Sequence, residues 1–246
     1  MIVTLDELRR FCRDALRGAG APAGVDEEAA RAAVWLEARG LPALPAVVAA
    51  LDRWADDASA TALAELPPEA GGRRFDAAGR SAVFLAGGLM DLAVALAAGA
   101  RGASRMHVSN LRDPWFFVPA AALAGPDDRV LHVSWRRRGG ASGAGARVGP
   151  GPKLALLGDC QDAPPKGRFD VSIACAPGAG AGDPDAPSVP LCEADLDARR
   201  LRVLALGLRV NGHDWARLRD YAKRVLVPSS PESEARGAGS TASDNE

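Results

Sequence analysis

The stretch that decides the fold is Asp26–Trp54, which reads DEEAARAAVWLEARGLPALPAVVAALDRW. Its acidic start suits the positive end of a helix, with Asp26 as the predicted N-cap. Gly40 stands where a left-handed C-terminal cap is needed, and Pro45 suits the first turn of a following helix. The stretch therefore predicts two helices joined by a sharp break at Arg39-Gly40.

A third helix is predicted before this pair. Thr4 and Glu7 have the spacing of a capping box, and apolar residues then follow at helical intervals. The predicted N-terminal helices are Thr4–Arg17, Asp26–Arg39 and Ala46–Trp54. Because short turns join them, we expect them to pack as one helical layer within residues 1–65.

The pattern changes from Ser81 onward, where short apolar runs alternate with further helices. We predict strands at Ala82–Leu85, Met106–Ser109, Arg129–Trp135, Lys153–Leu157, Phe169–Ala174 and Leu201–Val210, and helices at Leu89–Ala98, Trp115–Ala124 and Trp215–Val225. The Pro- and Gly-rich stretches 66–79, 139–152 and 176–190 are predicted to be connectors. Short connections after residue 129 favour antiparallel pairing.

These elements predict an α+β fold, in which an N-terminal three-helix layer packs on a mixed, largely antiparallel sheet with further helices. We expect a single domain over residues 1–227, with the sheet and its helices in 81–227. Residues 228–246 are rich in Ser, Gly, Ala and acid and have no apolar periodicity, so they are predicted to be a disordered tail.

Composition limits the classes of function. The 246 residues are 48% apolar and carry a net charge of -1, which gives no general attraction to nucleic acid or to an anionic membrane. The four cysteines lack metal-ligand spacing, so we expect reduced thiols and no metal site. No basic N-terminal leader is present, and no apolar stretch approaches about 20 residues. A soluble, cytoplasmic protein is predicted.

Familiar catalytic motifs are missing. The glycine-rich runs at 143–149 and 178–182 are not followed by a helix, as a dinucleotide fingerprint requires, and no P-loop is present. No serine lies in a G-x-S-x-G elbow. His107 and His132 fall within predicted strands and His213 at a predicted helix start, where structural roles explain them.

The loop 110–115 is the most informative candidate, since it follows a strand and precedes a helix. Arg112, with Asn110 beside it, would bind an anion at the helix N-terminus, and Asp113 would cap that helix or act as an acid. Capping and salt bridging alone would explain Arg112 and Asp113, and this is the interpretation that we favour. Arg136-Arg137-Arg138 would form an anion clamp, although a solvated strand end is the interpretation we favour.

Several segments resemble the NAD(P)-dependent malate/lactate dehydrogenase family that lacks a Rossmann domain. Arg39-Gly40 resembles the joint that leads in that family to Ser-His-Gly, whose His acts on the substrate. Gly88–Ala97 is similar to the helix under the sheet of those enzymes, and Met106–Asn110 to their strand before an Asn-Ser-x-His-Phe-Gly loop. Phe117–Gly125 is similar to their next Ala-rich helix, and the C-terminal run after Val227 resembles the end of an uncharacterised bacterial family.

The resemblance implies that the reactive histidines are replaced. Leu44 occupies the position of the first, Arg112 or Asp113 that of the second, and the cofactor motif has no clear match. We therefore expect a catalytically degenerate relative that binds a small anionic ligand, through Asn110 and Arg112, or a partner. The alternative is an NAD- or NADP-dependent oxidoreductase acting on a 2-hydroxy or 2-oxo acid, with His107 or Asp113 as the acid/base. A homo-oligomer is left open.

Overall fold

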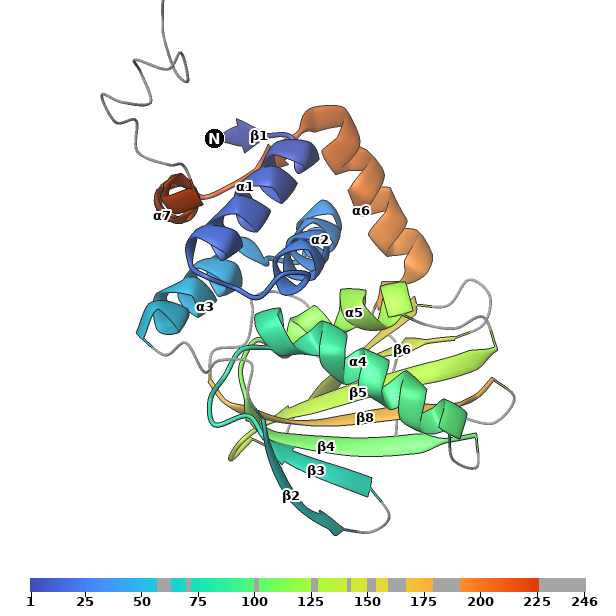
Figure 1. Cartoon of the computed structure of the whole chain (residues 1–246). Coiled ribbons are helices and arrows are strands. Elements are labelled where there is room, and N and C mark those ends of the chain that lie inside the picture. Colours follow the sequence, from blue (N-terminus) through green and yellow to red (C-terminus); the bar gives the residue numbers. More distant parts are fainter. Residues whose placement is uncertain are drawn as a thin grey trace, which may run out of the picture.

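The computed structural model describes residues 1–56, 63–69, 72–99, 102–124, 128–140, 143–149, 154–158, 167–178 and 191–225. Three layers are stacked in this part of the chain: a sheet, two helices that lie on it, and an outer set of helices (Figure 1). The buried apolar residues of all three layers form one cluster. The α+β class predicted from the sequence is confirmed.

The outer layer combines helices from both ends of the chain. It consists of α1 (Leu5–Gly18), α2 (Val25–Ala38), α3 (Leu44–Asp56), α6 (Glu193–Leu206) and α7 (Gly212–Ala222), which continues into the short η2 (Lys223–Val225). α7 packs on both α1 and α3. The strands β1 (Ile2–Val3) and β10 (Leu208–Arg209) pair antiparallel and fasten the N-terminus to the C-terminal helices. The predicted capping box of Thr4 and Glu7 is confirmed.

The break between α2 and α3 follows the prediction. Gly40 has φ +70°, and the N–H of Leu41 donates to the carbonyl of Leu36 at 2.9 Å, which closes the left-handed cap. The buried Glu37 then caps the next helix, because its Oε1 accepts the N–H groups of Ala43 and Leu44, both at 2.7 Å. Pro45 lies in the first turn of α3.

The predicted N-cap of α2 was wrong. Gly24, with φ +93°, occupies that position, and Asp26 lies inside the first turn. The Asp26 carboxylate instead accepts the N–H of Gly24 at 3.0 Å and pairs with Arg17 of α1. The acid therefore joins two helices rather than starting one.

The middle layer contains α4 (Ala82–Gly99) and, after the short η1 (Pro114–Phe116), α5 (Phe117–Ala124). The strand predicted at Ala82–Leu85 was wrong, since those residues form the first turns of α4. All four are buried between two layers, and a segment that is apolar on every side has no periodicity to separate helix from strand. The expectation that no apolar stretch approaches the length of a membrane span was wrong, because the 18 residues of α4 are long and apolar enough, with 50% of them buried inside the protein.

The sheet has the strand order β2-β3-β4-β8-β5-β6-β7-β9. Its strands are β2 (Ala64–Glu69), β3 (Gly72–Asp76), β4 (Ser104–Leu111), β5 (Arg129–Arg137), β6 (Gly143–Val148), β7 (Leu154–Gly158), β8 (Phe169–Pro177) and β9 (Leu191–Cys192). The neighbours pair antiparallel, as predicted, except that β3 and β4 are parallel. α4 connects these two parallel strands.

Three predicted segments differ. The connector predicted at 66–79 overlaps β2 and contains β3. Pro67-Pro68 lie in β2, an edge strand, at a register shift where proline is tolerated. The predicted loop 139–152 contains β6. Most of the strand predicted at 201–210 belongs to α6, where Leu201, Leu204 and Leu206 are exposed, so their spacing did not reflect burial. The tail 228–246 lies outside the described residues.

Candidate functional site

The parallel strands β3 and β4 bring two loops together at their carboxyl ends, at the left of Figure 1. The N–H of Ala82 donates to the carbonyl of Arg112, and the N–H of Arg112 donates to the carbonyl of Arg80, both at 2.9 Å. Ligands of sheets with parallel strands bind outside such carboxyl ends. We therefore take residues 77–82 and 110–113, with the side chains around them, as the candidate site.

The backbone of this site is strained. Ala78, Asn110 and Asp113 have φ of 50°, 62° and 56°, and they are all the non-glycine residues with positive φ in the described part of the chain. The left-handed conformation costs an alanine about 1–2 kcal/mol. Strain of this kind gathers at functional sites, where the surrounding structure maintains it.

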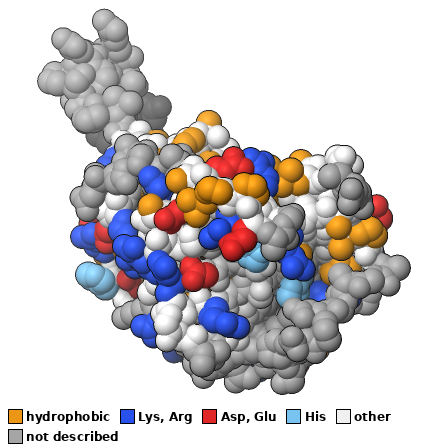
Figure 2. All heavy atoms as spheres, turned by 90° about the horizontal axis from the view of Figure 1, so that it is seen from below, with side chains coloured by type: hydrophobic (Ala, Val, Ile, Leu, Met, Phe, Trp, Pro, Cys, Tyr) orange, Lys and Arg blue, Asp and Glu red, His pale blue; other side chains and the backbone are white. Residues whose placement is uncertain are grey.

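Asn110 holds two guanidinium groups at the end of β4. Its Oδ1 accepts from Arg138 Nη1 at 2.7 Å and from Arg168 Nη1 at 3.3 Å, while its Nδ2 donates to Asp76 Oδ2 at 3.5 Å. Arg138 also lies 3.6 Å from Asp170 Oδ1. Basic side chains gather with acidic ones on the left of Figure 2, which views the molecule from below Figure 1.

Arg112 approaches the same place from the other loop. Its Nε donates to the carbonyl of Gly79 at 3.1 Å, and no hydrogen bond from its two Nη atoms is found among the described residues. A Cβ on Gly79 would lie 3.3 Å from Arg168 Nη2. Arg112 and Arg168 therefore both reach Gly79, and three guanidinium groups meet at this edge of the sheet.

Asp113 belongs to a different network, on the side of the helices. Its Oδ2 accepts from Ser81 Oγ at 2.6 Å and from Arg53 Nη2 at 3.0 Å. Ser81 Oγ in turn accepts the N–H of Val83 at 3.2 Å and so caps α4. Burial raises the pKa of the Asp113 carboxyl, against the opposing effects of Ser81 and Arg53. Asp113 therefore links Arg53 of α3 to the residue that caps α4.

His107 lies away from Asp113. Side chains alternate along β4, and Met106 and Val108 are buried under the helices while His107 is exposed on the other face of the sheet. Its neighbours in the register are Arg74 of β3 and Ser172 of β8. Partial burial, together with the charges of nearby arginines, lowers the pKa of His107.

Leu44 is also separate from this site. It is the buried first residue of α3, whereas Arg53, which binds Asp113, follows nine residues later on the same helix. At 1.5 Å per residue these positions lie about 14 Å apart along the helix axis. The structure thus brings Asn110, Arg112 and Asp113 to one edge and leaves His107 and Leu44 elsewhere.

The sequence did not identify most of the residues around these loops. Arg53, Ser81 and Arg168 gave no signal, because each comes from a separate element that only the tertiary structure brings here. Arg138 belongs to the arginine run 136–138, which we interpreted as a solvated strand end, and its half-exposed side chain donates to Asn110. Within the described ranges, no group of three or more His, Cys, Asp and Glu side chains is arranged to hold a metal ion.

Comparisons with known proteins support the fold. Residues 3–81 match the family described as "Protein of unknown function (DUF3726)". Curated proteins give no match to the sequence.

Solved structures of dehydrogenases are similar over nearly the whole chain. A dehydrogenase from Sinorhizobium meliloti has a TM-score of 0.66 at 16% identity, covering 90% of this chain and 99% of that one. The sulfolactate dehydrogenase from Methanocaldococcus jannaschii has a TM-score of 0.62 at 10% identity, covering 92% of this chain and 97% of that one. The malate dehydrogenase from Pyrococcus horikoshii OT3 has a TM-score of 0.59 at 13% identity, covering 94% of this chain and 97% of that one. At these identities the likeness shows the fold alone, and at that level the distant resemblance expected from the sequence is confirmed.

Proposed function

We propose that this protein uses a dehydrogenase-like fold to bind a small anion, such as a carboxylate, without the acid/base chemistry of those enzymes. The observation that carries the proposal is the meeting of Arg112, Arg138 and Arg168 around Asn110 and Gly79. A planar guanidinium group presents paired N–H donors that match the two oxygens of a carboxylate. Asp76 and Asp170 offset part of this charge, so the arginines leave a net positive site.

The loss of catalysis is supported by the surroundings of two residues. Leu44, at the position that the resemblance assigns to the first histidine, is aliphatic and buried. Asp113, near the position of the second, is already bonded to Ser81 and Arg53. Removing a general acid or base typically lowers the rate about 100- to 10,000-fold. The proposed protein therefore binds its ligand and releases it unchanged.

Calorimetric titration with pyruvate and with sulfate tests this proposal. We expect saturable binding to the wild type, and a loss on the order of tenfold in affinity for Arg138→Ala and for Arg168→Ala, because each removes a charged donor. Arg147→Ala, an exposed arginine on β6, is the matched control and should bind like the wild type. Absence of binding to the wild type, or equal affinities in all variants, would contradict the proposal.

An NAD(P)-dependent oxidoreductase acting on a small 2-hydroxy or 2-oxo acid is the second candidate. The raised pKa of the Asp113 carboxyl favours it, since a group that retains its proton to higher pH is the better general acid. Titration with NADH and NADPH, followed by nucleotide fluorescence, separates the two candidates. Saturable binding that is quenched by a 2-oxo acid, with turnover lost in Asp113→Asn, would establish the oxidoreductase; flat titrations would exclude it.

The remaining expectations about partners and location stay predictions from the sequence. They are a cytoplasmic protein that binds neither nucleic acid nor membrane, with self-association left open. Light scattering of the full chain measures the last of these directly.

A further inference from the structure

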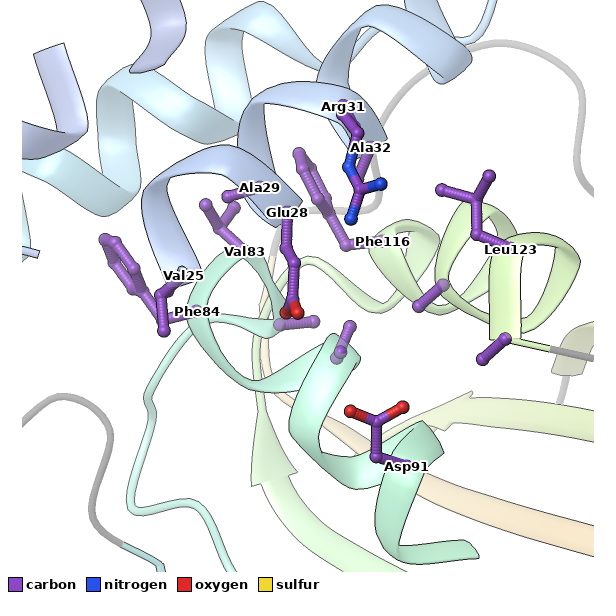
Figure 3. A pocket seen from close by; sticks show the side chains of 15 residues that line it. Val25, Glu28, Ala29, Arg31, Ala32, Val83, Phe84, Asp91, Phe116 and Leu123 are labelled. Atoms are coloured by element: carbon purple, nitrogen blue, oxygen red, sulfur yellow. The ribbon is translucent and has the colours of Figure 1, made fainter. Parts of the chain in front are cut away.

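A cavity of about 140 Å³ lies between α2, α4 and α5, outside the arginine site (Figure 3). Its walls are mostly apolar and built from small side chains, which let the three helices leave a space between them. The apolar residues include Ala29, Ala32, Ala86, Ala120 and the fully buried Phe116. Three charged residues line the same cavity, namely Glu28, Arg31 and Asp91.

The three charged side chains are exposed and stand at the rim of the cavity, where it opens to solvent. In Figure 3, Glu28 and Arg31 extend from α2 toward α4, and Asp91 extends from α4 toward them. Among the residues that the structure describes, no ion pair joins these three side chains to one another, although Arg31 acts electrostatically on the neighbouring Glu27. Glu28 and Arg31 are three residues apart on one helix, a spacing that permits a pair. Their charges are therefore available to a ligand group at the mouth of the cavity.

Gly87 fixes the direction of Glu28. It lies within α4, where glycine costs about 1 kcal/mol relative to alanine. A Cβ at this position would overlap Glu28 Oε2, whereas a Cβ on the neighbouring Gly88 would meet nothing within 4 Å. The missing side chain of Gly87 thus makes room for the Glu28 carboxylate against α4, at the edge of the cavity.

We propose that this cavity binds a small zwitterion of the α-amino-acid class. The Arg31 guanidinium group receives the ligand carboxylate, and the Glu28 and Asp91 carboxylates receive its ammonium group, which has three donors. The alanines and Phe116 accommodate a short aliphatic side chain. A simple anion would be repelled by the two carboxylates, and a simple amine would make no use of the Arg31 guanidinium group. The inference shares no charged residue with the anion site and does not depend on it.

Calorimetric titration of the full chain with L-alanine and L-valine tests the assignment. Isovalerate and isobutylamine, which are valine without its ammonium group and without its carboxylate, are the matched probes. We expect one or both amino acids to bind saturably, and both single-charge probes to bind weaker by about tenfold or more. Failure of both amino acids to bind, or binding of a single-charge probe as tight as that of valine, would overturn the proposal.

Neighbouring glycines provide matched variants. Gly87→Ala should displace the Glu28 carboxylate, a flexible side-chain end, and so weaken amino-acid binding by about tenfold while the fold persists. Gly88→Ala adds the same methyl group one residue away and should bind like the wild type. Arg31→Gln should show the same loss as Gly87→Ala, and Arg219→Gln on α7 should show none. Melting curves establish that each variant is folded, and equal affinities in Gly87→Ala, Arg31→Gln and the wild type would refute the site.

Discussion

The edge of the sheet and the cavity between the helices contrast in how their polar groups are used. At the edge, Asn110 and Asp113 have strained backbones, and their side chains are bonded to three arginines and a serine. In the cavity, the backbone is regular helix, and Glu28 and Asp91 have no ion-pair partner among the described residues. A dense network indicates a site that is already organised, whereas charged groups around an open space indicate room for a ligand.

Removing Asp113 should show the largest effect, because it breaks the organised network. Asp113→Ala leaves Ser81 and the partly buried Arg53 without their acceptor, and alanine tolerates the left-handed backbone less well than aspartate. We expect the free energy of unfolding, measured by urea denaturation, to fall by about 2–3 kcal/mol, less than for a fully buried pair since Arg53 is 38% exposed.

The matched variant for that experiment is Asp113→Asn. It retains an acceptor for Ser81 and a residue that adopts the left-handed conformation, so it should lose only about 1 kcal/mol. If Asp113→Ala is as stable as the wild type, the network at the edge of the sheet is not a structural requirement.

Relieving the backbone strain at Ala78 should raise the free energy of unfolding, by less than the loss of Asp113 lowers it. Ala78 is exposed and has φ of 50°, so Ala78→Gly removes a steric cost that exceeds the added freedom of the unfolded chain. We expect a gain of about 0.5–1 kcal/mol in the free energy of unfolding. A loss of stability would show that the alanine methyl group makes a contact that outweighs the strain.

The smallest effect should be a pH dependence of stability that arises from Glu37. This residue lies on the same helix as Glu28, but its carboxylate accepts two backbone N–H groups. Burial raises the pKa of the Glu37 carboxyl, although the N–H groups of Leu44 and Ala43 oppose the shift. The folded protein therefore binds this proton more tightly than the unfolded chain. The stability that results is complete below the ordinary glutamate pKa of about 4.3 and is lost as pH rises through the raised value.

Glu37→Gln abolishes this titration and retains the oxygen acceptor. As the pH rises from 4 to 8, the melting temperature of the wild type should fall relative to that of Glu37→Gln. Glu28→Gln, measured at one neutral pH, controls for replacing a glutamate on α2 and should change the melting temperature little. If the melting temperature of the wild type instead rises relative to that of Glu37→Gln with increasing pH, the predicted direction of the Glu37 pKa shift is wrong.

Local signals in the sequence located much of the fold. Gly40 and Pro45 predicted the break between α2 and α3, and the Thr4–Glu7 pair predicted the start of α1, because caps and turns depend on residues a few positions apart. The periodicity of apolar residues gave the wrong element type where a segment was buried on all sides or exposed. Ala82–Leu85 is buried on all sides and Leu201–Leu206 is largely exposed, so neither run has a pattern that burial on one face imposes.

The candidate site was only partly visible for the same reason. The loop from Asn110 to Asp113 could be found, because it follows a strand and precedes a helix. Its partners Arg53, Ser81 and Arg168 lie on three other segments, and the cavity joins Glu28 to Asp91 across two helices. The sequence by itself determined the caps, the breaks and the chemical types of the side chains, since these depend on near neighbours. Only the tertiary structure decided which side chains meet, because that depends on how distant elements bury their apolar surfaces against one another.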